Sequence, residues 1–142
     1  MYRHILALID CTDDARREAI QIARQFASEP TTRITIAANV TPTDDPALRR
    51  KKQEHARGAL HAIGDLLTGE GMYARKRVLE AEDAVDAVLA EASRPQECYD
   101  LIVLGAHQAR PEMDEMPCRG SLADRLALRA SVPVMVLPSR PR

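Results

Sequence analysis

Short apolar runs alternate with longer amphipathic stretches along the whole chain. Residues 4–9 and 101–104 are almost continuously apolar, a pattern typical of strands that are buried on both faces of a sheet. Residues 33–40 and 132–137 form two more apolar runs, and a weaker one spans residues 73–79. We therefore predict five strands, which end near Ile9, Val40, Leu79, Leu104 and Leu137.

Apolar positions three and four residues apart predict four helices between these strands. Thr12 is a candidate N-cap for the first helix, and the second is expected to begin with Asp45 as N-cap and Pro46 at its first position. Gly69 and Gly71 are expected to end the second helix, and the fourth should begin near Ser121. The second helix has its predicted apolar face at Ala56, Ala59, Leu60, Ile63 and Leu67.

The strict alternation of strands and helices predicts an α/β fold of the Rossmann-like kind. Such a fold has right-handed crossovers and a parallel sheet that is covered by helices on both faces. With 142 residues and no linker, repeat or low-complexity segment, residues 1–142 are expected to form one domain. Ligands of open α/β sheets bind at the carboxyl ends of the strands, so the loops after Ile9, Val40 and Leu104 are the candidate site.

Composition and charge exclude several classes of function. The formal net charge is −1, from 20 basic and 21 acidic residues, so bulk charge does not attract the chain to nucleic acid. The basic run at residues 49–52 is expected to be the solvated face of a helix. No apolar stretch is long enough for membrane insertion, and no signal peptide precedes the first strand, so we expect a cytoplasmic protein.

Three places at the ends of the predicted elements could bind a ligand. The carboxylate of Asp10, at the end of the first strand, could accept hydrogen bonds from a ribose or an adenine amine, or it could cap the following turn. Gly105 would let a ligand approach the backbone closely. Gly120 and Ser121 open a helix whose free N–H groups could bind an anion, or Ser121 could simply be an N-cap. The residues alone leave these alternatives open.

The same segments together resemble the universal stress protein family. The resemblance is carried by residues 5–10, the Gly105 turn and the run from Gly120 to Ala123 that leads into residues 132–136. It extends over essentially the whole chain, and the C-terminal stretch is its most specific part. It implies a five-stranded parallel sheet in the order 3-2-1-4-5 and usually a dimer. Many members of this family hold ATP between the first and fourth strands.

The resemblance also implies a set of nucleotide-binding positions. Asp10, the backbone around Leu8, and Val40 match positions that hold adenine and ribose in the nucleotide-binding branch of the family. Gly105 matches the first glycine of the phosphate signature, and Gly120 with Ser121 matches its last pair. The predicted ATP-binding residues are therefore Leu8, Asp10, Val40, Gly105, Gly120 and Ser121.

The phosphate half of this signature departs from the family pattern. Its second glycine falls on Gln108, its last pair comes two residues late, and a further hydroxyl is replaced by Ala123. Acidic residues 112, 114 and 115 would repel phosphates if they faced inward. The turn from Gly105 to Gln108 is instead similar to that of the universal stress protein A branch, which is thought not to hold ATP. ATP binding and its absence both remain open.

The cysteines and histidines suggest no catalytic or metal site. Three cysteines without paired spacing form no disulfide framework. Cys11, His107 and Cys118 could meet near one cleft and bind zinc or act as a redox pair, although separate thiols are the simpler explanation. Cys98 is expected to be remote. Neither a nucleophile elbow nor a Walker loop nor an H-E-x-x-H motif is present, so we expect no catalytic residue and no metal.

The expected function is that of a non-enzymatic stress-response signalling or adaptor protein with an unidentified protein partner. A homodimer is expected through the edge strand from Val132 to Leu137, because an apolar edge invites another strand and Pro133 suits an edge position. The alternative is a slow ATPase or another nucleotide-dependent enzyme on the same fold. An enzyme would need a base or nucleophile at the carboxyl edge of the sheet, where only Asp10 and His107 qualify.

Overall fold

The computed structural model describes residues 2–9, 15–26, 32–105 and 122–137. Strands and helices alternate through these segments as the sequence predicts. Along the chain the elements are β1 (His4–Leu8), α1 (Ala15–Phe26), β2 (Arg33–Val40), α2 (Pro46–Gly69), β3 (Ala74–Glu80), α3 (Ala84–Ala92), β4 (Leu101–Leu104), α5 (Leu122–Arg129) and β5 (Val134–Val136).

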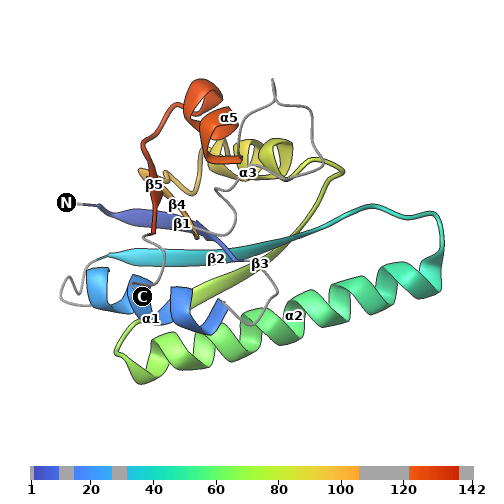
Figure 1. Cartoon of the computed structure of the whole chain (residues 1–142), viewed down its shortest axis with the longest axis horizontal. Coiled ribbons are helices and arrows are strands. Elements are labelled where there is room, and N and C mark those ends of the chain that lie inside the picture. The colour runs from blue at the N-terminus through green and yellow to red at the C-terminus, as the bar shows by residue number, and fades with distance from the viewer. Residues whose placement is uncertain (1, 10–14, 27–31, 106–121, 138–142) are drawn as a thin grey trace, which may run out of the picture.

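The five strands form one parallel sheet in the order β3-β2-β1-β4-β5. Helices α1 and α2 cover one face of the sheet, and α3 and α5 cover the other (Figure 1). The predicted α/β architecture and the predicted strand order are therefore confirmed.

Alternate side chains of the central strand β1 contribute to two separate core layers. Ile5 and Ala7 pack in the layer beneath α1 and α2, whereas Leu6 and Leu8 pack in the layer beneath α3 and α5. All five residues of β1 are buried, as are all four of β4. This two-sided burial explains why both strands are almost continuously apolar in sequence.

The ends of the strands differ from the predicted ends by at most one residue. β2 and β4 end as predicted, β1 and β5 end one residue early, and β3 ends one residue late. Past the end of β1, the Ile9 N–H still donates to the Ala37 carbonyl at 2.7 Å. β5 begins two residues later than predicted, at Val134, because Pro133 has no N–H to donate to a strand ladder.

Both ends of α2 are formed by the residues that the sequence singles out. The Asp45 carboxylate accepts a hydrogen bond from the Ala47 N–H at 3.0 Å, as an N-cap does. At the other end Gly71 has a φ of +87°, and the Met72 N–H donates to the Leu67 carbonyl at 2.8 Å. These are the features of a Schellman motif, which needs glycine at the left-handed position.

The amino-terminal half of α2 projects beyond the sheet (Figure 1). The buried residues of this helix all lie at or after Ala56, and every residue from 44 to 51 is exposed. We call residues 41–57 the α2 arm. The Arg49 guanidinium ties the arm to the end of β3 by donating to both carboxylate oxygens of Glu80, at 2.8–3.3 Å. Neither this long helix nor any other in the described segments is apolar enough to cross a membrane.

Candidate functional site

The carboxyl ends of β1 and β4 lie side by side at the point where the strand order reverses. Leu8, the last residue of β1, is the register partner of Leu104, and Gly105 follows directly. Leu8 and Gly105 are both buried. The fold therefore brings two of the predicted nucleotide-binding residues, which are distant in sequence, to one edge of the sheet. In open α/β sheets this switch point is where ligands bind.

β2 extends past the carboxyl end of β1 and borders it on one side. We call the last three residues of β2, from Ala38 to Val40, the β2 wall. Leu8 pairs with Ala37, and β2 continues for three more residues to Val40. At about 3.3 Å per residue, the wall extends about 10 Å beyond the last paired residue of β1. The half-buried side chain of Val40 packs against the core beneath α1 and α2, and its carbonyl accepts a hydrogen bond from Ala81 at 3.2 Å. The carboxyl end of β1 is therefore bordered by the last residues of β2.

Asn39 braces this wall, and sequence reasoning did not single it out. Its side-chain amide donates to the Ala81 carbonyl at 3.0 Å, and its side-chain oxygen accepts from the Ala81 N–H at 3.1 Å. The two bonds fasten the connection between β3 and α3 to the end of β2. The available signal was the one amide side chain in the run from 33 to 40, next to the predicted ligand contact Val40.

The remaining predicted site residues lie outside the described segments. These are Asp10 in the adenosine half, and Gly120 and Ser121 in the phosphate half. Gln108 and the proposed thiol and imidazole group of Cys11, His107 and Cys118 are also outside them. Within the described segments, no group of three or more His, Cys, Asp or Glu residues is placed to hold a metal ion. Cys98 is exposed and precedes β4, at the opposite edge of the sheet, as expected.

A buried polar network occupies that opposite, amino-terminal edge. The His4 ring is completely buried and stacks on Tyr99, with ring centroids 4.2 Å apart. Its Nδ1 lies 2.7 Å from the Glu97 carbonyl and must carry a proton, because a carbonyl only accepts hydrogen bonds. Its Nε2 lies 2.8 Å from the Thr35 hydroxyl. The imidazole therefore links β1, β2 and the segment that leads into β4.

Glu91 of α3 is one of two buried carboxylates of this network, and Glu97 is the other. Glu91 is 3% exposed and accepts hydrogen bonds from Tyr99 at 2.7 Å, Arg94 at 3.0 Å and Arg77 at 3.1 Å. Burial alone would raise the pKa of Glu91, but these donors and their charges more than offset it and hold the pKa below its ordinary value. Burial, together with the neighbouring carboxylates, raises the pKa of Tyr99 to about 12.

The network is better explained as structural than as catalytic. The buried carboxylate of Glu91 is matched by three donors, and buried charges in proteins need such partners whether or not they react. The two aromatic rings of the network also lie away from the switch point, with His4 at the amino end of β1 and Tyr99 just before β4. A perturbed pKa in this place therefore does not mark an active site.

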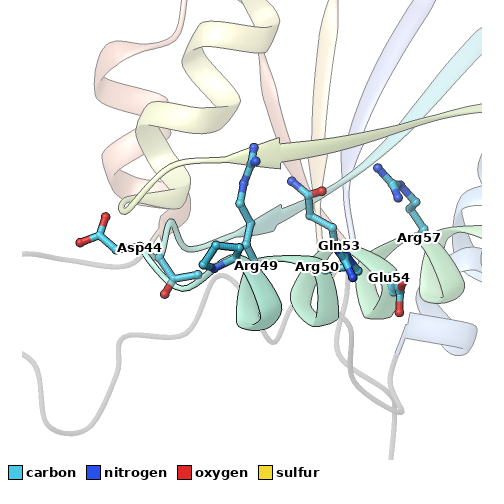
Figure 2. A pocket seen from close by; sticks show the side chains of 8 residues that line it. Asp44, Arg49, Arg50, Gln53, Glu54 and Arg57 are labelled. Atoms are coloured by element: carbon cyan, nitrogen blue, oxygen red, sulfur yellow. The ribbon is translucent and has the colours of Figure 1, made fainter.

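A polar hollow lies along the α2 arm and not at the switch point. Its volume is about 560 Å³, and Figure 2 shows Arg49, Gln53 and Arg57 projecting side by side from successive turns of the helix. The full lining comprises Thr43, Asp44, Pro46, Arg49, Arg50, Gln53, Glu54 and Arg57.

Several solved structures share this fold over nearly the whole chain. A protein from the universal stress protein family of Burkholderia pseudomallei is 24% identical, with 97% of each chain covered and a TM-score of 0.72. A universal stress protein in complex with cAMP is 21% identical, with 98% of this chain and 99% of that one covered and a TM-score of 0.75. The universal stress protein from Archaeoglobus fulgidus in complex with dAMP is 17% identical, with 96% and 98% covered and a TM-score of 0.70.

Sequence comparison assigns the family more directly than these structural likenesses do. No curated protein gives a significant match. The sequence model described as the universal stress protein family matches residues 1–138, which is almost the entire chain. The protein therefore belongs to the universal stress protein family.

Proposed function

We propose that this protein is a binding domain that holds an adenine nucleotide at the carboxyl ends of β1 and β4. The observation that carries the proposal is the convergence of Leu8, Val40 and Gly105, which come from three separate segments, on one edge of the sheet. These residues match nucleotide-binding positions of the family. Two structural neighbours in complex with cAMP and dAMP support adenine as the recognised part of the ligand.

The adenosine half of this site matches the family better than the phosphate half does. We propose that the adenine ring rests on the end of β1 against the β2 wall and that Asp10 accepts hydrogen bonds from the ribose or the adenine amine. Phosphate would lie near Gly105 and the N–H groups of Gly120 and Ser121. Gln108 and the lengthened signature affect only the phosphate half, so a nucleotide with one phosphate should bind at least as well as ATP.

Calorimetric titration with AMP, cAMP and ATP tests this proposal, with GTP as the control for the base. Ser121→Ala should weaken nucleotide binding by about 0.5–1.5 kcal/mol, the contribution of one hydrogen bond. Ser131→Ala, at an exposed serine after α5, is the matched control and should have no effect. If no adenine nucleotide gives heat at millimolar concentration, the proposal is wrong and the chain belongs with the branch typified by universal stress protein A.

A second substitution distinguishes between two departures from the family's phosphate signature, the missing second glycine and the two additional residues. Gln108→Gly restores the second glycine of the signature without shortening the loop. A gain in ATP affinity would identify the missing glycine as the defect. An unchanged affinity would point to the two additional residues of the loop.

We further propose that the protein signals as a homodimer through contacts with another protein and without catalysis of its own. β5 forms an edge of the sheet, and its apolar Val136 is 41% exposed. A two-fold axis could pair two copies of this edge antiparallel, so that one surface serves both subunits. Incubation with ATP separates this proposal from a slow ATPase, because phosphate release above that of a boiled sample would establish an enzyme.

A further inference from the structure

The α2 arm concentrates positive charge in a chain that is close to neutral. Residues 41–57 contain five basic side chains and three acidic ones, an excess of two positive charges, whereas the whole chain has a formal net charge of −1. The arm that carries these basic residues projects beyond the sheet (Figure 1). The arm therefore presents a local positive field to solvent, and a field of this kind steers acidic partners.

Two of the five cations hold the arm in place, and three are available to a partner. Arg49 is committed to Glu80, and Lys52 donates to the Thr41 hydroxyl at 2.7 Å. The other three are exposed and form no ion pair with any other residue in the described segments. They are Arg50, Lys51 and Arg57.

The geometry of the hollow suits an extended ligand better than a compact one. Arg50 and Arg57 are two helical turns apart, or about 10 Å along the axis, and Gln53 lies between them. In Figure 2 the side chains of Arg49, Gln53 and Arg57 project in parallel from successive turns and do not converge on one point. A single phosphate is best held by donors that converge on it. An acidic polypeptide can instead offer a carboxylate to each turn.

We propose that the α2 arm is the surface on which this protein docks an acidic segment of a partner protein. Arg50 and Arg57 pair with carboxylates of the partner. The Gln53 amide between them, which already donates to Glu80 at 3.5 Å, gives its second N–H to the partner. Leu48, which is 41% exposed, supplies an apolar contact beside the charges. Because Arg49 and the Asp45 cap already order the arm, docking costs little conformational entropy. The inference rests on the proposed adaptor role.

Fluorescence anisotropy with dye-labelled decaglutamate tests the docking surface directly. The double variant Arg50→Glu, Arg57→Glu should bind the peptide about fivefold more weakly than the unmodified protein, because two exposed charge pairs are lost. The matched control is Arg24→Glu, Arg33→Glu, which reverses two exposed charges outside the arm and changes the net charge equally. It should bind within about twofold of the unmodified protein. The milder pair Arg50→Gln, Arg57→Gln, with far-UV circular dichroism, shows whether the helix is retained.

Three results would overturn the inference. The unmodified protein could fail to bind decaglutamate at about 50 mM salt, where exposed charges are weakly screened. The control variant could lose as much affinity as the arm variant, which would indicate bulk charge alone. Oligothymidylate or tripolyphosphate could bind the arm more tightly than decaglutamate, which would make it a nucleic-acid or phosphate surface. The titrations contain no adenine nucleotide, so each of these results would leave the nucleotide proposal standing.

Discussion

At Gly64 the absence of a side chain lets a lysine from the sheet lie across a helix. A Cβ atom at this position would lie 2.5 Å from Cε of Lys76 and 3.3 Å from its Nζ, whereas a Cβ at Gly58 would meet nothing within 4 Å. Both glycines are inside α2, where alanine is favoured over glycine by about 1 kcal/mol. Gly58→Ala should therefore raise the free energy of unfolding by about that amount. Gly64→Ala should raise it by less, because Lys76 must move.

Urea denaturation of the two variants measures this difference. The increase in the free energy of unfolding for Gly58→Ala minus the increase for Gly64→Ala measures the free-energy cost of displacing the Lys76 side chain from the helix surface. An equal or larger gain at Gly64 would show that Lys76 does not occupy that place in solution.

The buried carboxylate of Glu91 should make the protein sensitive to acid. Its pKa in the folded state is lowered, so its contribution to stability is complete above the pKa of the unfolded chain, about 4.3. That contribution is lost as the pH falls through the folded pKa, in the window below about pH 5. Glu91→Gln should lower stability at pH 7 by about 2 kcal/mol, the scale of a hydrogen bond to a charged group.

The pH profile distinguishes this charge effect from a simple packing defect. Below pH 5 the stability of Glu91→Gln should depend less on pH than that of the unmodified protein. Glu82→Gln, the same change at an exposed glutamate, is the control and should leave the profile unaltered. Two parallel profiles for Glu91→Gln and the unmodified protein would contradict a charged role for Glu91.

Sequence reasoning predicted residues whose role is local and missed those whose partners are distant. Asp45, Pro46 and Gly71 were predicted correctly because caps and left-handed turns depend on a few neighbouring positions. Glu91 gave no such signal, because its partners Tyr99 and Arg77 come from other segments and meet it only in the folded chain.

At the scale of the elements, the two halves of α2 are stabilised by different kinds of contact. Its second half packs on the sheet, whereas the arm depends on Asp45 and on the contact of Arg49 with Glu80. Asp45→Ala removes the cap, a loss of about 1 kcal/mol in a typical helix. Because the first turns of α2 are exposed, this loss should appear as fraying of the arm and not as global unfolding.

Hydrogen exchange can localise that effect. In Asp45→Ala the amides of the first two turns of α2 should exchange about fivefold faster, while those around Leu60 and Ile63 should be unchanged. Asp44→Ala is the matched control at the neighbouring exposed aspartate. Uniformly faster exchange along α2 would mean that the arm and the packed half unfold together.

The projection of α2 could have been predicted, but the extent of β5 could not. The predicted apolar face of α2 begins only at Ala56, so the residues before it had nothing to bury. The apolar run from 132 to 137 predicted six strand residues, and the ladder contains three. Pro133 delays the start, and Leu137 keeps one hydrogen bond to Leu104 at 2.8 Å after the strand has ended.

For the molecule as a whole, the edge strand β5 predicts a homodimer. Val134→Lys should place a charge in the interface between the two β5 strands and dissociate the dimer. Val136→Lys makes the same change at a more exposed residue and disturbs the core beneath α5 less. The matched control is Leu48→Lys, an exposed leucine on the α2 arm.

Sedimentation velocity at micromolar concentration measures the result. The two β5 variants should sediment as monomers with unchanged helix content, and Leu48→Lys should remain dimeric. If the unmodified protein is a monomer, the dimer proposal is wrong. If the β5 variants remain dimers, the interface lies elsewhere.

For the whole molecule, the order of the strands could be predicted from the sequence, whereas the complete site could not. Alternating strands and helices restrict the topology strongly, and the family resemblance supplied the order 3-2-1-4-5 that the sheet has. For the site, Leu8, Val40 and Gly105 lie at the expected edge because strand ends position them. Gly120 and Ser121 follow a long connection in the sequence. The periodicity of apolar residues does not determine where such a connection lies.

The central claim, an adenine nucleotide at the carboxyl ends of β1 and β4, is tested most directly by amide NMR. Titration of AMP into uniformly labelled protein should shift the amides of Ile9, Val40 and Gly105 most strongly. The α2 arm, including Arg50 and Arg57, should remain unperturbed. Shifts confined to the arm, or no shifts at millimolar AMP, would contradict the claim.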